Sequence, residues 1–138
     1  MQSTELDPTL AETLSAAEGR GWKLIIANKN YSSWSMRPWV AMRAFGIPFS
    51  EVVVPLGRPE TGAEIARHSA AGRLPVLETG AITIWDSLAI CEFLAEQFPE
   101  KQLWPANEAA RAMARSICAE MHSGFGDLRL AMWMNIRA

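Results

Sequence analysis

Short apolar runs and longer amphipathic stretches alternate along the first half of the chain. The apolar run at residues 23–27 predicts a buried strand. A helix is predicted to start near Ser35, with Pro38 tolerated in its first turn and Gly46 at its end. Residues 49–54 are rich in valine and predict a second strand. A strand, a helix and a strand in this order predict a right-handed crossover and a parallel pair of strands.

The following segment predicts a helix, a hairpin and another helix. A weaker helical pattern covers residues 59–69. Residues 74–79 and 81–85 are β-rich runs on either side of Gly80, a pattern that is typical of a hairpin. An apolar helical pattern then continues to Pro99. We expect this helix to bury the following side chains: Leu88, Cys91, Leu94 and Phe98.

These elements predict four segments of chain. Residues 1–21 are expected to be a flexible or loosely docked extension. Residues 22–98 predict an α/β fold, a thioredoxin-like βαβ-α-ββα domain with a four-stranded mixed sheet and helices on both faces. Residues 99–107 are expected to form a linker. Residues 108–138 predict the first helix or helices of an all-α domain that is begun but not finished, with the helical pattern barely interrupted at Gly124 and Gly126.

Composition and charge narrow the possible partners. The 138 residues are 49% hydrophobic and 20% charged, with a net charge of −2, which gives no reason to expect nucleic acid or an anionic membrane as a partner. No apolar run approaches the ~18–20 residues that span a bilayer. The acidic first residues do not resemble a secretory signal, and the two separated cysteines suit a reducing compartment, so a cytoplasmic location is expected. Neither His68 nor His122 has a second metal ligand at the usual spacing.

Three motifs, in register and in order, resemble the amino-terminal domain of cytosolic glutathione transferases. Ser-Ser-Trp-Ser-Met-Arg at residues 32–37 is similar to the Ser-Ser-Cys motif of the serine-type zeta class, which includes maleylacetoacetate isomerase and has bacterial members. Trp34 stands where that motif has its cysteine. Gly-Arg-Leu-Pro-Val-Leu at residues 72–77 is similar to the family's glycine–basic–valine–proline stretch, with Leu74 in place of valine. Residues 84–94 resemble its acidic-Ser-Leu-Ala-Ile strand-to-helix turn.

The resemblance implies glutathione as co-substrate and a hydroxyl that activates its thiol. A free thiol has a pKa of about 8.5, so little thiolate exists at neutral pH. A hydroxyl hydrogen-bonded to the sulfur, and the positive end of a helix, both favour the thiolate. By resemblance Ser32 is expected to supply this hydroxyl, with Ser33 as the alternative and Tyr31 as a distant third. From the residues alone, both serines could serve only as helix caps.

The other two motifs are expected to bind the glutathione backbone and its two ends. The resemblance implies a cis bond between Leu74 and Pro75, which would present the backbone of Leu74 to the cysteinyl unit. Arg73 would hold the glycine carboxylate or lie in solvent as a surface arginine. Ser87 at a helix start suits the γ-glutamyl carboxylate, and Asp86 suits the neighbouring ammonium group. An Asp-Ser pair also suits a helix cap, and both interpretations can hold together.

The function expected from this resemblance is that of a glutathione transferase. Such an enzyme activates the glutathione thiol for attack on a small electrophile, in a conjugation or in a glutathione-dependent isomerisation. The alternative is a non-catalytic binding or dimerisation module on the same fold. A thiol–disulfide oxidoreductase is disfavoured, because no cysteine occupies the active-site loop. The apolar side chains in residues 108–138 predict a homodimer in which this segment is covered by a neighbour or poorly ordered. We expect little conjugating activity from the chain alone, since in this family the later helices supply much of the electrophile pocket.

Overall fold

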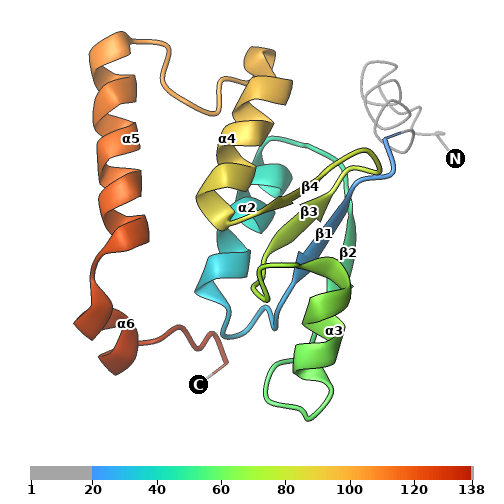
Figure 1. Ribbon diagram of the computed structural model, residues 1–138. Coiled ribbons are helices and arrows are strands. Elements are labelled where there is room, and N and C mark those ends of the chain that lie inside the picture. Colours follow the sequence, from blue (N-terminus) through green and yellow to red (C-terminus); the bar gives the residue numbers. More distant parts are fainter. Residues whose placement is uncertain (1–19, 138) are drawn as a thin grey trace, which may run out of the picture.

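Figure 1 shows the computed structural model of the protein, which describes residues 20–137. The extension expected at residues 1–21 lies outside the described residues except for Arg20 and Gly21. The first seven described elements are, in chain order, β1 (Lys23–Ile26), α2 (Ser33–Ala44), β2 (Ser50–Val53), α3 (Thr61–His68), β3 (Val76–Glu78), β4 (Thr83–Trp85) and α4 (Ser87–Gln97).

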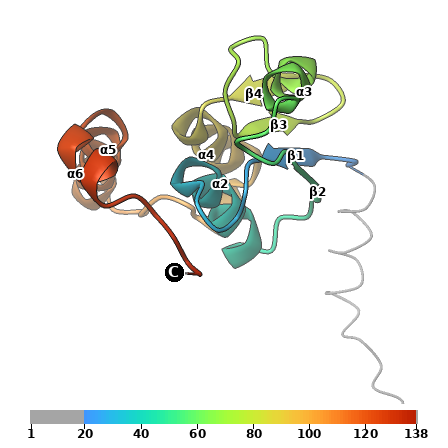
Figure 2. The same ribbon diagram turned by 90° about the horizontal axis from the view of Figure 1, so that it is seen from below.

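The four strands form one mixed sheet in the order β2-β1-β3-β4. β1 runs parallel to β2, with Leu24 opposite Glu51, and antiparallel to β3, with Leu24 opposite Leu77. β3 and β4 pair as an antiparallel hairpin in which Leu77 lies opposite Ile84. Helices α2 and α4 cover one face of the sheet and α3 covers the other (Figures 1 and 2). The predicted α/β fold with a thioredoxin-like domain is therefore confirmed.

The alternating side chains of β1 enter two separate cores, because successive residues of a strand point to opposite faces. Ile25 packs on the face of α3, with Val54, Val76 and Ile65. Leu24 packs on the opposite face, under α2 and α4. The buried residues of this larger core are Trp22, Leu24, Ile26, Met42, Ile47, Leu77, Ile90, Leu94 and Phe98.

Helix α4 buries a different set of side chains from the one expected. Ile90 and Leu94 are fully buried, whereas Leu88 and Cys91 are only partly buried. Both of the latter line a cavity toward the next long helix instead of facing the sheet. The prediction that Leu88 and Cys91 are core residues was therefore wrong, because this helix packs on two sides and the apolar pattern alone does not distinguish them.

The chain beyond α4 contains a short 3-10 helix at Pro99–Lys101 and then α5 (Glu108–Ser123) and α6 (Gly126–Ala131). The helical pattern was expected to be barely interrupted at Gly124 and Gly126, whereas the structure has a full break there: α5 ends at Ser123 and Gly124 is its C-cap. A Cβ atom at Gly124 would lie 2.9 Å from the carbonyl oxygen of Glu120. The next residue has a positive φ of 62°, which takes it out of the helical region and turns the chain into α6.

Helices α5 and α6 form a third layer, on the side of α2 and α4 that faces away from the sheet (Figures 1 and 2). After α6 the chain returns to the loop that follows β1. The backbone N–H of Ile136 donates to Asn30 O at 3.2 Å, and that of Arg137 donates to Asn30 Oδ1 at 2.8 Å. Within residues 20–137, none of the helices has the length and apolar character that crossing a membrane requires.

Candidate functional site

The start of α2 places a serine hydroxyl at the mouth of a cavity. Ser32 is the N-cap of the helix, and its Oγ accepts a hydrogen bond from the Ser35 N–H at 3.2 Å. Helix α2 consequently begins at Ser33, two residues earlier than expected. Ser32 Oγ also donates to Ser35 Oγ at 2.8 Å. The capping role that the residue type allowed is thus real, and it leaves the hydroxyl partly exposed at the positive end of the helix.

The loop before β3 brings the second motif to the same region. The peptide bond between Leu74 and Pro75 is cis, as the family resemblance predicted. Gly72 has a φ of +68°, and the N–H of Arg73 donates to Ser69 Oγ at 3.2 Å, so both help to form the turn that precedes the cis bond. The side chain of Arg73 is exposed.

In the third motif, Asp86 and Ser87 have different roles at the start of α4. Asp86 is the N-cap of α4, and its Oδ1 accepts from the N–H groups of Leu88 at 2.9 Å and Ala89 at 3.2 Å. Ser87 is the first residue of the helix and is only 2% exposed. Its Oγ has no hydrogen-bond partner among the described residues. A buried polar atom without a partner is costly, so this hydroxyl has unused hydrogen-bonding capacity at the cavity.

One cavity of about 790 Å³ unites the three motifs. It has the size of a small-molecule site. Six of the seven predicted site residues line it: Ser32, Arg73, Leu74, Pro75, Asp86 and Ser87. The seventh, Ser33, is the first residue of α2 and is absent from the lining.

His122, for which the sequence offered no second metal ligand and no role in the site, lies at this cavity. Its Nε2 is 2.9 Å from Asp86 Oδ2, and its ring meets Trp34 edge-on with the centroids 5.2 Å apart. Its Nδ1 is buried and has no partner among the described residues. His122 belongs to α5 and is 36 residues from Asp86, so no local motif could have connected them.

Comparison with known proteins agrees with this geometry. The model of the family "Glutathione S-transferase, N-terminal domain" matches residues 31–97, which include all three motifs. Residues 31–97 therefore belong to the glutathione S-transferase family as its N-terminal domain. Maleylpyruvate isomerase of Ralstonia sp is 33% identical over 96 residues, which are 66% of this chain and 45% of that protein. Maleylacetoacetate isomerase of Rattus norvegicus is 33% identical over 101 residues, which are 71% of this chain and 47% of that protein.

A solved structure extends the similarity to the fold. The crystal structure of a glutathione transferase homolog from Burkholderia, with bound glutathione, matches with a TM-score of 0.68 and 27% identity. The match covers 80% of this chain and 61% of that one. The present chain spans about half the length of the curated relatives that it matches.

In this member of the glutathione S-transferase family, the tryptophan at the motif cysteine position connects α2 with α6. The guanidinium groups of Arg37 and Arg129 lie over the Trp34 ring, at 4.0 Å and 4.5 Å from its centroid. Burial and the nearby Arg129 charge lower the pKa of Arg37. Arg129 also donates to the carbonyl oxygens of Gly124 and Met121, so it anchors α6 to the end of α5.

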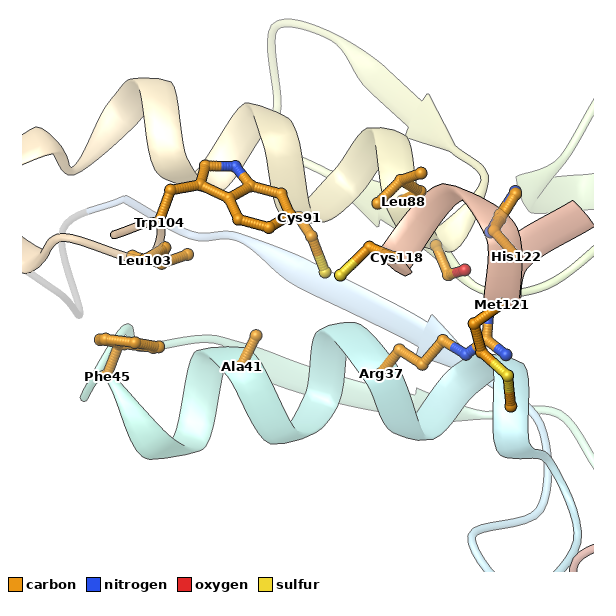
Figure 3. A pocket seen from close by; sticks show the side chains of 11 residues that line it. Arg37, Ala41, Phe45, Leu88, Cys91, Leu103, Trp104, Cys118, Met121 and His122 are labelled. Carbon is orange, nitrogen blue, oxygen red and sulfur yellow. The ribbon is translucent and has the colours of Figure 1, made fainter. Parts of the chain in front are cut away.

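A second cavity, of about 290 Å³, lies between α2, α4 and α5 (Figure 3). Cys91 of α4 and Cys118 of α5 project into it with their sulfur atoms toward each other. Burial, reinforced by the nearby Cys118, raises the pKa of Cys91 to about 11. This thiol is therefore protonated at neutral pH. Ser87 and His122 line both cavities.

Proposed function

We propose that this protein binds glutathione in the 790 Å³ cavity and activates its thiol for attack on a small electrophile. The observation that carries this proposal is the convergence of three separate features on one cavity: the Ser32 hydroxyl, the cis bond between Leu74 and Pro75, and the buried hydroxyl of Ser87. Within this proposal, residues 22–98 are the glutathione-binding domain, residues 99–107 link it to the helical segment, and residues 108–138 begin the second domain.

The γ-glutamyl end of glutathione fits the start of α4. The unpartnered Ser87 hydroxyl and the positive end of α4 suit its carboxylate. Asp86 uses one oxygen to cap the helix and the other to contact His122, and its exposed carboxylate suits the ammonium group. Because the Nδ1 of His122 is buried without a partner, this histidine has a hydrogen-bonding position left for the same end of the ligand.

The rest of the tripeptide follows the cavity toward α2. The backbone of Leu74 pairs with the cysteinyl unit as one rung of a β-ladder, and the exposed Arg73 is within the lining to hold the glycine carboxylate. The thiol then lies near Ser32, where a hydroxyl donor and the positive end of α2 both favour the thiolate. A depression of the thiol pKa by about 2 units corresponds to about 2.7 kcal/mol.

The reaction starts with the thiolate adding to an electrophilic carbon. The sulfur lone pair forms a carbon–sulfur bond. In conjugation a leaving group departs with its electron pair. In isomerisation the thiolate adds to an activated double bond, the adduct rotates about the resulting single bond, and the thiolate is expelled unchanged. The similarity to two isomerases favours testing both outcomes. A reaction that needs reduced glutathione suits a reducing compartment, so we also propose a cytoplasmic location.

The decisive experiment separates binding from turnover. Retention on immobilised glutathione and calorimetry measure binding, and a chloronitrobenzene substrate measures conjugation. Ser32→Ala is expected to lower kcat by at least tenfold and to change the glutathione Kd by less than about threefold, since the hydroxyl acts on the thiolate. Ser116→Ala on α5 is the matched control. Binding without turnover of conjugation or isomerisation substrates would support a non-catalytic glutathione-binding module instead. Failure to bind glutathione would refute the proposed function and leave only the dimerisation module.

We further propose that the protein forms a homodimer through α5 and α6. None of the residues of α5 is buried, and exposed apolar side chains continue to the end of the described chain. The exposed ones are Met113, Ile117, Met121, Phe125, Leu128, Leu130, Met132, Trp133 and Ile136. An exposed apolar surface of this extent is typical of a protein–protein interface. Light scattering over a concentration series tests this, and a monomer at tens of micromolar would contradict it.

A further inference from the structure

Ser35 is a buried polar side chain whose function the preceding proposal leaves open. It lies in the first turn of α2 and is only 2% exposed. Its Oγ accepts a hydrogen bond from the N–H of Ala27, at the end of β1, at 3.0 Å. The same Oγ is 2.8 Å from Ser32 Oγ, and its backbone N–H donates to Ser32 Oγ at 3.2 Å. Ser35 therefore contacts the proposed thiol-activating hydroxyl twice.

The direction of the bond between the two hydroxyls determines what Ser32 can do. A hydroxyl has one hydrogen to donate and two lone pairs that accept, and its hydrogen rotates to suit its surroundings. In the structure, Ser32 Oγ donates to Ser35 Oγ. The same oxygen–oxygen distance serves equally well when Ser35 is the donor. Ser32 Oγ then accepts from both the N–H and the O–H of Ser35, and its own hydrogen is available to the cavity.

We propose that Ser35 is a positioning residue that presents the hydrogen of Ser32 to the glutathione thiolate, an inference that rests on the proposed function. When the thiolate is bound, the Ser32 O–H turns to the sulfur and the Ser35 O–H donates to Ser32 Oγ. The hydrogen bonds then run in one direction, from Ala27 N–H through Ser35 and Ser32 to the sulfur. Each bond polarises the next, so the Ser32 hydroxyl becomes a better donor to the negative charge.

The position of Ser35 supports this arrangement. Its Oγ is held by a backbone N–H of the buried end of β1, which keeps it in place independently of the ligand. Both Ser32 and Ala27 line the 790 Å³ cavity, so the two ends of the chain of hydrogen bonds lie at the ligand. A purely structural role, in which Ser35 only ties β1 to α2, makes a different prediction: loss of stability with no change in the ionisation of the bound thiol.

The test measures the pKa of the glutathione thiol when it is bound to the protein. The ultraviolet absorption of the thiolate is followed against pH for the wild type, Ser32→Ala, Ser35→Ala, Ser35→Thr and the control Ser116→Ala. Binding of S-methylglutathione, which has no ionisable thiol, shows which variants retain the folded site. Ser35→Cys, which keeps the shape but donates weakly, replaces Ser35→Ala if the latter does not fold.

The proposal predicts a graded result. Ser32→Ala is expected to raise the pKa of the bound thiol most, and Ser35→Ala is expected to raise it by about 0.5–1 unit, the scale of one hydrogen bond. Ser35→Thr and Ser116→Ala are expected to match the wild type, and all variants are expected to bind S-methylglutathione within about threefold of it.

Two outcomes would overturn different statements. If Ser32→Ala raises the pKa while Ser35→Ala, or Ser35→Cys in its place, leaves it unchanged, the positioning role of Ser35 is wrong and the proposed function stands. If the wild type does not bind glutathione or does not lower its thiol pKa, the proposed function itself fails.

Discussion

The sheet domain buries many of its apolar side chains, whereas the α5–α6 segment leaves most of its own exposed. In the sheet domain Leu24, Leu77 and Ile90 are completely buried. In the α5–α6 segment Leu130 is 83% exposed, and none of the residues of either helix is buried. The sheet domain therefore holds its shape through its own core, whereas the segment is held to it by partly buried side chains and by aromatic and polar contacts.

These polar contacts are few and largely exposed. His122 bonds to Asp86, Arg115 pairs with Glu92 at 3.3 Å, and residues near the end of the chain bond to Asn30. Exposed ion pairs contribute about 0–1 kcal/mol each. The difference in burial between the two regions shows that a segment can supply a residue to the candidate site and still add little to the stability of the fold. Helix α5 does this with His122.

The largest expected effect comes from the core of the sheet domain. Leu77→Ala is expected to lower the free energy of unfolding by about 2–5 kcal/mol, because it removes a fully buried side chain and leaves a cavity. Leu130→Ala, the matched change on α6, is expected to stay within about 0.5 kcal/mol. Denaturant unfolding measures both. Equal effects would contradict the contrast between the two regions.

The next prediction concerns the thiol of the sheet domain that faces α5. Because burial raises the pKa of Cys91 from 9.0 to about 11, its thiolate fraction at pH 8 is about a hundredfold below that of an ordinary cysteine. Alkylation of Cys91 by iodoacetamide is expected to be correspondingly slow and to accelerate about tenfold per pH unit between pH 8 and 10. Peptide mass spectrometry reads the rate, with a free cysteine peptide as reference. Fast labelling at pH 8 would show that α5 does not shield α4.

A smaller effect concerns an acidic residue of the sheet domain. Burial disfavours the charge of Glu51, but hydrogen bonds from Lys29, Arg43 and Trp39 outweigh it and lower its pKa from 4.5 to about 2. A carboxylate whose pKa is depressed in the folded state stabilises that state at any pH above its unfolded-state pKa. This stabilisation is lost as the pH falls from about 4.5 to about 2. Glu51→Gln is expected to cost about 1 kcal/mol at pH 7, after solvent screening, and much less near pH 2. Thermal unfolding at both pH values measures this, and a pH-independent cost would mean that the charge is not responsible.

The smallest effect tests the contribution of α5 to the site. His122→Ala removes the bond to Asp86 and is expected to weaken glutathione binding by about 0.5–1 kcal/mol. The unfolding free energy is expected to change by less than about 0.5 kcal/mol. Calorimetry and denaturant unfolding on the same samples give both values, with Ser123→Ala as the control on α5. A loss of stability larger than the loss of affinity would show that α5 is part of the folding unit.

Several features of the fold and the site could be predicted from local sequence. The apolar run after Gly21 and the valine-rich run before Pro55 identified β1 and β2, because buried strands need apolar side chains whatever surrounds them. The three motifs identified six of the residues that line the larger cavity, because each lies at a strand end or helix start whose geometry is local. The extent of the break at Gly124 was underestimated, since a glycine by itself does not show which way the chain turns.

The sequence by itself determined the order of the strands and helices, the caps at Ser32 and Asp86, and the family to which residues 31–97 belong. Periodicity and capping act within a few residues, so they can be followed along the chain. Only the tertiary structure decided that His122 meets Asp86 and that Cys91 faces α5 and not the sheet. Those contacts depend on the path of residues 99–107, which sets where α5 lies against α4, and no local pattern encodes that path.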